Sequence, residues 1–179
     1  MRSRRQIEQI VAQILVKHRI QNAPIPVEAI AVAENLPVIE SSFGSDVSGA
    51  LIRSNGFTGI AVNGSQHPNR KRFTVAHELA HHALAHVGEH DHIDWKFTIL
   101  RRDGKSSEAS DDREMEANFF AASLLMPKEF LKKDLLLRIG TNGEADLQSE
   151  DILTLAKRYQ VSETAMKYRL MNLGFISPI

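Results

Sequence analysis

Residues 72–81 of this chain read Arg72-Phe73-Thr74-Val75-Ala76-His77-Glu78-Leu79-Ala80-His81. The last five have the pattern His-Glu-X-X-His, and no Gly or Pro interrupts residues 70–87, so we predict a helix here. Positions i and i+4 of an α-helix lie one above the other, which points the imidazoles of His77 and His81 at one ion. The stretch therefore predicts a helix that carries two ligands of a metal site.

The residue types at this site indicate hydrolysis. Neutral imidazole suits zinc, and two ligands from one helix leave room for a third ligand and a water. Glu78 lies about 100° around the helix from His77, where its carboxylate can reach that water rather than the ion. We therefore predict one Zn²⁺ ion, for which manganese or another divalent ion could substitute, and Glu78 as the general base.

Length and composition favour a small globular protein of the cytoplasm. The 179 residues fit one domain, or one domain with a small appendage, and 42% of them are hydrophobic. The net charge of zero gives no argument for nucleic acid or an anionic membrane as partner. The chain has no cysteine, which excludes disulfides and thiolate ligands, and no apolar run approaches the length of a membrane span.

A histidine does not suit the third ligand position. The longer zinc-binding pattern with three histidines places its third His ten residues after the first, and that position is Val87 here. His86 would fall on the opposite face of a continuing helix, and His82 is rotated away from the line of His77 and His81. We expect His82 and His86 to contact the ligands or the substrate, or to be exposed.

A carboxylate from a second predicted helix, residues 112–126, is the better candidate, and Glu114 and Glu116 compete for the role. Glu114 shares its face mostly with small residues, which permit a close approach of two helices: Ala117, Asn118, Ala121 and Leu125. Glu116 shares its face with bulkier neighbours: Phe119, Phe120 and Ser123. We therefore choose Glu114, with Asn118 placed to orient a ligand by a hydrogen bond. The alternative is that both glutamates are solvated charges on a helix surface.

The remaining pattern predicts an α+β fold, mostly helical, with a small antiparallel sheet before the metal-binding helix. Two apolar runs, 49–53 and 59–63, flank Ser54-Asn55-Gly56, a strong hairpin turn. An extended substrate could pair with an exposed edge of this hairpin, or the hairpin could simply cover the core. A short strand at 36–40 and further helices complete the pattern: 3–18, 27–35, 130–137 and two within 149–173.

A Gly-rich linker at 140–144 divides the chain in this prediction. Residues 1–139 form the zinc peptidase domain, and residues 140–179 form a helical extension packed on it. Residues 155–170 have helix-turn-helix character, with four basic residues that could contact DNA: Lys157, Arg158, Lys167 and Arg169. Neutral charge and the lack of a full three-helix domain favour two packing helices instead, so we do not expect direct DNA binding.

Two blocks of this sequence resemble the ImmA/IrrE family of zinc metallopeptidases. The first is residues 72–81, and the second is Glu114-Met115-Glu116-Ala117-Asn118-Phe119-Phe120-Ala121-Ala122-Ser123-Leu124-Leu125-Met126-Pro127. The similarity extends roughly over residues 25–175. It implies a gluzincin-like fold with zinc on His77, His81 and Glu114, and with Glu78 as the base.

The resemblance also implies a substrate and a setting. Members of this family are cytoplasmic enzymes of bacteria or phages that cleave XRE-type helix-turn-helix repressors. The segment before the peptidase is too short here to hold an XRE domain, so we expect the repressor to be a separate protein. Other relatives form toxin–antitoxin-like modules, and a regulatory protein that only binds an XRE partner or DNA is the alternative to an enzyme.

The sequence does not decide which residue stabilises the oxyanion that forms on the carbonyl oxygen during peptide cleavage. His82, His86, Tyr168 and His92 are the candidates, in that order.

Overall fold

The computed structural model describes residues 1–44, 47–54, 56–86, 92–95, 108–139 and 147–177. Within these ranges the chain forms helices and one small sheet, which confirms the predicted α+β fold. None of the described helices is both long and apolar enough to cross a membrane. The helices are α1 (Arg4–Lys17), α2 (Val27–Ala33), α3 (Pro68–Ala83), α4 (Glu108–Leu125), α5 (Lys128–Ile139), α6 (Ser149–Tyr159) and α7 (Glu163–Asn172).

The sheet contains the predicted hairpin. Its strands are β1 (Val38–Ser41), β2 (Val47–Ser54), β3 (Phe57–Asn63) and β4 (His92–Trp95), in the spatial order β1-β3-β2-β4. β2 and β3 are antiparallel, with Leu51 opposite Ile60. Gly56 in the connecting turn has φ +80, the backbone conformation for which an Asn-Gly pair is favoured.

The sheet corrects one expectation. β1 runs parallel to β3, so the sheet is mixed rather than purely antiparallel. The reason is that the β2–β3 hairpin returns the chain to the direction of β1 and places β3 between β1 and β2. β1 pairs with β3 along residues 60–63, and β4 pairs with β2 along residues 47–51. β1 and β4 therefore occupy most of the two edges of the hairpin, and β3 is buried against the core. Pairing of a substrate with an edge of the sheet stays a prediction.

Helix boundaries follow local capping chemistry. Ser3 and Gln6 form a capping box at the start of α1, and the Ser162 hydroxyl accepts a hydrogen bond from the backbone N–H of Ala165 at the start of α7. α1 begins within one residue of the predicted helix 3–18, and α7 lies within the stretch 149–173 that was predicted to hold two helices. The buried stripe of α1 consists of Ile7, Val11 and Leu15.

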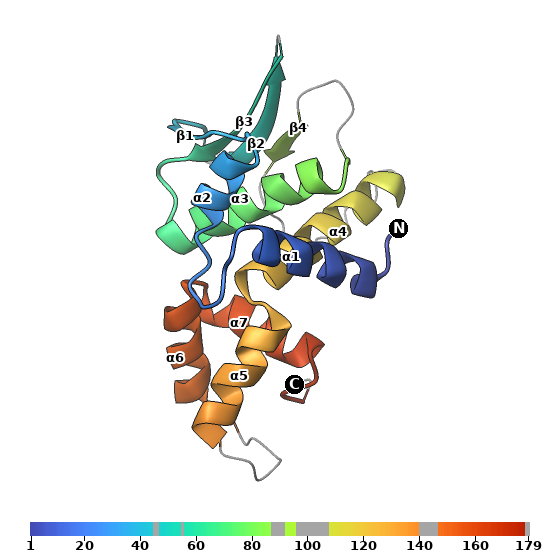
Figure 1. Ribbon diagram of the computed structural model, residues 1–179. Helices are drawn as coiled ribbons and strands as arrows, with labels where there is room; N and C mark the ends of the chain where they lie inside the picture. Colours follow the sequence, from blue (N-terminus) through green and yellow to red (C-terminus); the bar gives the residue numbers. More distant parts are fainter. Residues whose placement is uncertain (45–46, 55, 87–91, 96–107, 140–146, 178–179) are drawn as a thin grey trace.

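α3 lies at the centre of the molecule. Figure 1 shows the sheet above α3, α4 and α1 beside and below it, and α5 to α7 in the lower part. α3 contacts β2, β3, α2 and α4, and residues 74–81 on it are all buried. One continuous apolar core reaches from α1 through α3 and α4 to α7. The metal-binding motif is thus part of the core rather than of a surface loop.

The C-terminal helices pack on the rest of the chain. Gln160, with φ +54, turns the backbone between α6 and α7. Arg169 of α7 donates hydrogen bonds to Glu8 of α1 and to the carbonyl oxygen of Met126. The predicted linker at 140–144 lies outside the described residues, and the division into 1–139 and 140–179 stays a prediction.

Candidate metal centre

The helix that carries the His-Glu-X-X-His motif starts at a defined cap. Pro68 occupies its first turn, and the ring of His67 accepts a hydrogen bond from the backbone N–H of Asn69. His77, Glu78 and His81 are 0–1% exposed. The predicted helix is therefore confirmed across the motif, and its polar side chains are directed into the protein.

α3 and α4 pack extensively against each other and bring three ligand atoms together. Nε2 of His77 and Nε2 of His81 lie 2.9 Å apart. The carboxylate of Glu114 reaches both, at 3.2 Å from Nε2 of His77 and 3.3 Å from Nε2 of His81. These three residues form a group that could hold a metal ion, and it includes every ligand predicted from the sequence.

The spacing of these atoms fits a tetrahedral ion. Zinc binds imidazole nitrogen and carboxylate oxygen at about 2.0–2.2 Å, which separates neighbouring ligand atoms in a tetrahedron by about 3.3–3.6 Å. The distances of 2.9, 3.2 and 3.3 Å lie at or slightly below this range. Two histidines and one carboxylate are also a known zinc donor set. Glu114 is 37% exposed, so the group has an open side.

Comparison with known proteins identifies the family. A family model described as the IrrE N-terminal-like domain (Peptidase_M78) matches residues 33–171. This chain belongs to that family. The radiation response metalloprotease IrrE of Deinococcus deserti is 35% identical over 111 residues, which are 62% of this chain and 35% of that protein.

Two further comparisons extend this result. The radiation response metalloprotease IrrE of Deinococcus radiodurans is 31% identical over 111 residues, 62% of this chain and 30% of that protein. The chain thus spans about a third of the length of the curated relatives it matches. A solved Mycobacterium tuberculosis transcriptional regulator has a TM-score of 0.60 at 14% identity, covering 93% of this chain and 46% of that one. At this identity the likeness concerns the fold alone.

The end of the motif helix in this IrrE-family chain corrects the expectation for His86. α3 ends at Ala83, and Ala85 adopts a left-handed conformation with φ +52. The backbone N–H of His86 donates to the carbonyl of His81, which closes a Schellman motif. The chain therefore turns back, and His86 does not lie on the opposite face. Its ring packs 5.2 Å from the ring of His81, centroid to centroid.

Glu116, the rejected ligand candidate, has a different partner on the same helix pair. Its carboxylate lies 2.9 Å from Nε2 of His86 and accepts a hydrogen bond from the Arg2 guanidinium at 3.0 Å. Burial by itself raises the pKa of Glu116, but hydrogen bonds from the Arg2 backbone, His86 and the Arg2 side chain lower it on balance. Burial lowers the pKa of His86, and Glu116 opposes this effect only in part.

Sequence reasoning missed this cluster of Arg2, His86 and Glu116. A non-glycine residue in the left-handed conformation leaves no trace in the pattern, because glycine is the usual marker of such a helix end. Arg2 is also remote from both partners in the sequence. The sequence showed only that Glu116 lies two residues after Glu114 on one predicted helix, and this spacing does not indicate its partners.

The other predicted site residues lie elsewhere. His82 is half-buried. Burial lowers its pKa, the positive charge of Arg53 lowers it further, and the negative charge of Glu34 opposes the effect. Asn118 is half-buried on α4, and within the described part of the chain no hydrogen bond joins it to a ligand. The side chain of His92 lies outside the described residues.

Tyr168 is not part of this centre. It is 56% exposed on α7. Its neighbour Arg169 contacts Met126, which follows the end of α4. Glu114 lies twelve residues before Met126, or about 18 Å along the helix. Within the described residues, no contact joins Tyr168 to the ligands.

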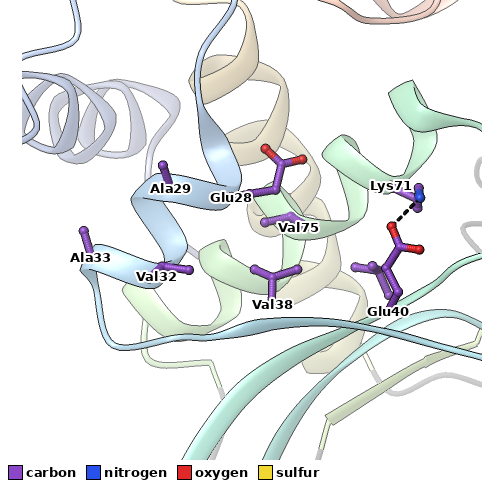
Figure 2. A pocket seen from close by; sticks show the side chains of 9 residues that line it. Glu28, Ala29, Val32, Ala33, Val38, Glu40, Lys71 and Val75 are labelled. Carbon is purple, nitrogen blue, oxygen red and sulfur yellow. Dashed lines mark hydrogen bonds and ion pairs between the residues drawn. The ribbon is translucent and has the colours of Figure 1, made fainter.

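A groove of about 550 Å³ lies beside α3 on another side. Figure 2 shows it between α2, β1 and α3, with Val75 at its floor and the Lys71–Glu40 ion pair at its rim. Lys71 and Val75 lie about 120–160° around α3 from His77. The groove therefore faces away from the two histidine ligands.

Proposed function

We propose that this chain is a zinc-dependent endopeptidase whose substrate is an XRE-type helix-turn-helix repressor, cleaved in the cytoplasm to relieve repression. One observation carries the enzymatic part: His77, His81 and Glu114 converge at distances suited to a tetrahedral ion. Glu78 is buried on the same helix, between the two histidines in sequence. The family membership supports peptidase chemistry, and the substrate class rests on the family resemblance.

In the proposed mechanism, His77, His81 and Glu114 hold the zinc ion. When bound, zinc supplies a Lewis acid that polarises the scissile carbonyl and makes a water nucleophilic at neutral pH. Glu78 accepts a proton from the attacking water while the water oxygen forms a bond to the carbonyl carbon. Glu78 then delivers that proton to the amide nitrogen as the C–N bond breaks, so one new carboxyl group and one new amine result.

Glu78 suits the role of base for a geometric reason. Next to His77 in sequence, it is rotated by about 100° from that ligand, which directs its carboxylate beside the ion rather than onto it. Its complete burial keeps bulk water away and strengthens its interaction with a proton donor.

The test is incubation of zinc-loaded protein with the XRE-type repressor encoded beside its gene, with Glu78→Gln in parallel. We expect wild type to produce two defined fragments, identified by mass spectrometry, and Glu78→Gln to bind zinc without cleaving. Glu129→Gln, an exposed charge on α5, serves as the matched control and should cleave normally. Cleavage by Glu78→Gln at the wild-type rate would contradict the mechanism.

The alternative of a DNA-binding module receives less support. Of the four basic residues in 155–170, Arg169 is 2% exposed and Arg158 donates to Asp134. The guanidinium of Arg169 lies inside the protein and is not available to a phosphate. If both wild type and Glu78→Gln formed a stable complex with the repressor and neither cleaved it, the binding-partner hypothesis would replace the peptidase.

A further inference from the structure

The C-terminal end of α3 is fixed by a polar cluster that the proposed reaction does not itself use. This cluster consists of Arg2, His86 and Glu116. His86 is 8% exposed and Glu116 is 5% exposed. A buried carboxylate and a buried imidazole need partners, and each supplies one to the other.

The chemistry of the cluster determines the roles of its atoms. Arginine only donates and a carboxylate only accepts, so Nε2 of His86 can donate to Glu116 or accept from Arg2, but not both. The distance from His86 Nε2 is 2.9 Å to Glu116 and 3.4 Å to the Arg2 guanidinium. The shorter distance favours donation to Glu116. Glu116 then receives hydrogen bonds from His86, the Arg2 side chain and the Arg2 backbone N–H.

Arg2 also binds the helix end directly. Its guanidinium donates to the carbonyl oxygen of Leu84 at 2.7 Å. The last carbonyls of a helix lack intrahelical partners and carry partial negative charge, which a cation stabilises. Arg2 therefore joins the end of α3 to Glu116 on α4. A second arginine, Arg113, donates to the carbonyl of His86 at 3.1 Å and strengthens the same junction.

The cluster is adjacent to the metal ligands on both helices. On α3, the ring of His81 lies between two other imidazoles, with His77 at 4.7 Å and His86 at 5.2 Å between centroids. On α4, Glu114 and Glu116 are two residues apart and point about 160° apart around the helix. Glu114 contacts His77 and His81 in the C-terminal half of α3, and Glu116 contacts His86 just after its end. Polar contacts therefore link α4 to this part of the chain both at the metal ligands and at the cluster.

We propose that Arg2, His86 and Glu116 are positioning residues for the metal centre: they hold the end of α3 against α4 so that His81 and Glu114 face one ion. This inference rests on the proposed metal-dependent function. The ring of His86 restricts rotation of the His81 imidazole, and the Glu116 contacts fix the distance between the two helices. Groups that orient ligands in this way typically raise metal affinity 10- to 100-fold.

The test uses zinc and cobalt alone as probes, with no peptide substrate. Zinc affinity is measured by competition with a chromophoric chelator for wild type, Arg2→Ala, His86→Ala and Glu116→Gln. The melting temperature of each metal-free protein is recorded in parallel. We expect zinc affinity to fall about 10- to 100-fold in each variant, and the visible spectrum of the Co²⁺-loaded proteins to change. The exposed Arg5→Ala and Glu129→Gln are matched controls and should retain wild-type affinity.

A merely structural role gives a different result. In that case the variants would melt earlier without metal but bind zinc as tightly as wild type, with an unchanged Co²⁺ spectrum, and the inference would be overturned. If His86→Ala fails to fold, Arg2→Ala decides, because the Arg2 side chain is 39% exposed and its loss leaves no large cavity.

The outcome also separates this inference from the proposed function. A wild-type protein that binds zinc but cleaves no repressor would contradict the substrate proposal and leave the positioning role intact. A wild-type protein that binds neither zinc nor cobalt would overturn both.

Discussion

Oε2 of Glu114 lies 3.2 Å from Nε2 of His77, although the two residues come from different helices. α3 supplies two ligand atoms through its own periodicity, whereas the third depends on how α4 packs. A metal ion bound here would therefore cross-link two elements of the core. This arrangement couples metal binding to the stability of the whole fold.

The first prediction concerns this coupling. Adding zinc to the metal-free protein should raise its free energy of unfolding by about 2.7 kcal/mol when free zinc is 100-fold above the dissociation constant. Glu114→Gln and His81→Ala should lose most of this increase, because each removes a ligand that joins the helices. Thermal melts over a series of zinc concentrations measure the effect. Met115→Ala, an exposed neighbour on α4, should keep it.

The second prediction concerns the approach of the sheet to α3. A Cβ atom on Gly49 of β2 would overlap Cγ2 of Thr74 and lie 2.8 Å from the carbonyl oxygen of Ala61. Gly49→Ala should therefore lower the free energy of unfolding by about 1–3 kcal/mol, as overpacking of a core does. Thr74→Ser in the same chain should restore part of the loss, since it removes Cγ2 but not the Ala61 contact.

Chemical denaturation of these variants provides the measurement. Gly44→Ala is the control, because no atom lies within 4 Å of a Cβ at that position. Equal effects at Gly44 and Gly49 would show that backbone entropy, rather than the contact with Thr74, determines the result.

The third prediction concerns the attachment of α7. Arg169 is 2% exposed; it donates to Glu8 at 2.8 Å and stacks 5.6 Å from the ring centroid of Phe119. Removing one partner of a buried ion pair costs about 3–5 kcal/mol, and we expect the lower end because Glu8 is 29% exposed. Urea unfolding of Arg169→Met should show this loss.

A double-mutant cycle with Glu8→Gln separates the ion pair from the other contacts of Arg169. The half-buried Lys167→Met on the same helix is the control and should change stability by less than about 0.5 kcal/mol. A null result for Arg169→Met would mean that α7 is held by its apolar face alone.

The fourth prediction concerns pH. Hydrogen bonds from Lys17 at 2.8 Å and from His18 at 2.6 Å lower the pKa of Glu34, with burial opposing them. As the pH falls, the carboxylate of Glu34 therefore takes up a proton at a higher pH in the unfolded chain than in the folded chain. The stability that Glu34 contributes is present above its unfolded pKa of about 4.3. This stability is lost as the pH falls through the lowered pKa that Glu34 has in the folded protein.

Glu34→Gln should thus be less stable than wild type at pH 7 by about 0.5–1 kcal/mol, a small value because Lys17 is largely exposed. The difference should shrink towards zero in acid. Urea denaturation between pH 7 and pH 3 measures it. A difference that stayed constant with pH would indicate a packing effect of the substitution instead of the carboxylate charge.

The sequence alone predicted the motif helix and the hairpin, and it favoured Glu114, whose carboxylate the structure places beside His77 and His81. These features are local or nearly so: helical periodicity places His77 and His81 on one line, and Asn-Gly specifies a turn. The small residues Ala117 and Ala121 indicated which face of α4 could approach another helix closely, and both are fully buried in the structure. The two helices predicted within 149–173 likewise appear as α6 and α7.

Only the tertiary structure determined the direction of β1, the position of His86 and the contacts of Arg2, because these features do not follow from the local sequence pattern. The direction of β1 depends on β3 lying between it and β2, and this order follows from strand pairing across the sheet. The position of His86 depends on Ala85 adopting φ +52, a conformation that the surrounding packing imposes on a residue that does not prefer it. Arg2 reaches Glu116 only because α1 lies across α4. Side-chain periodicity is a property of a single helix or strand, whereas these contacts arise from the relative placement of several, and only the folded chain determines that placement.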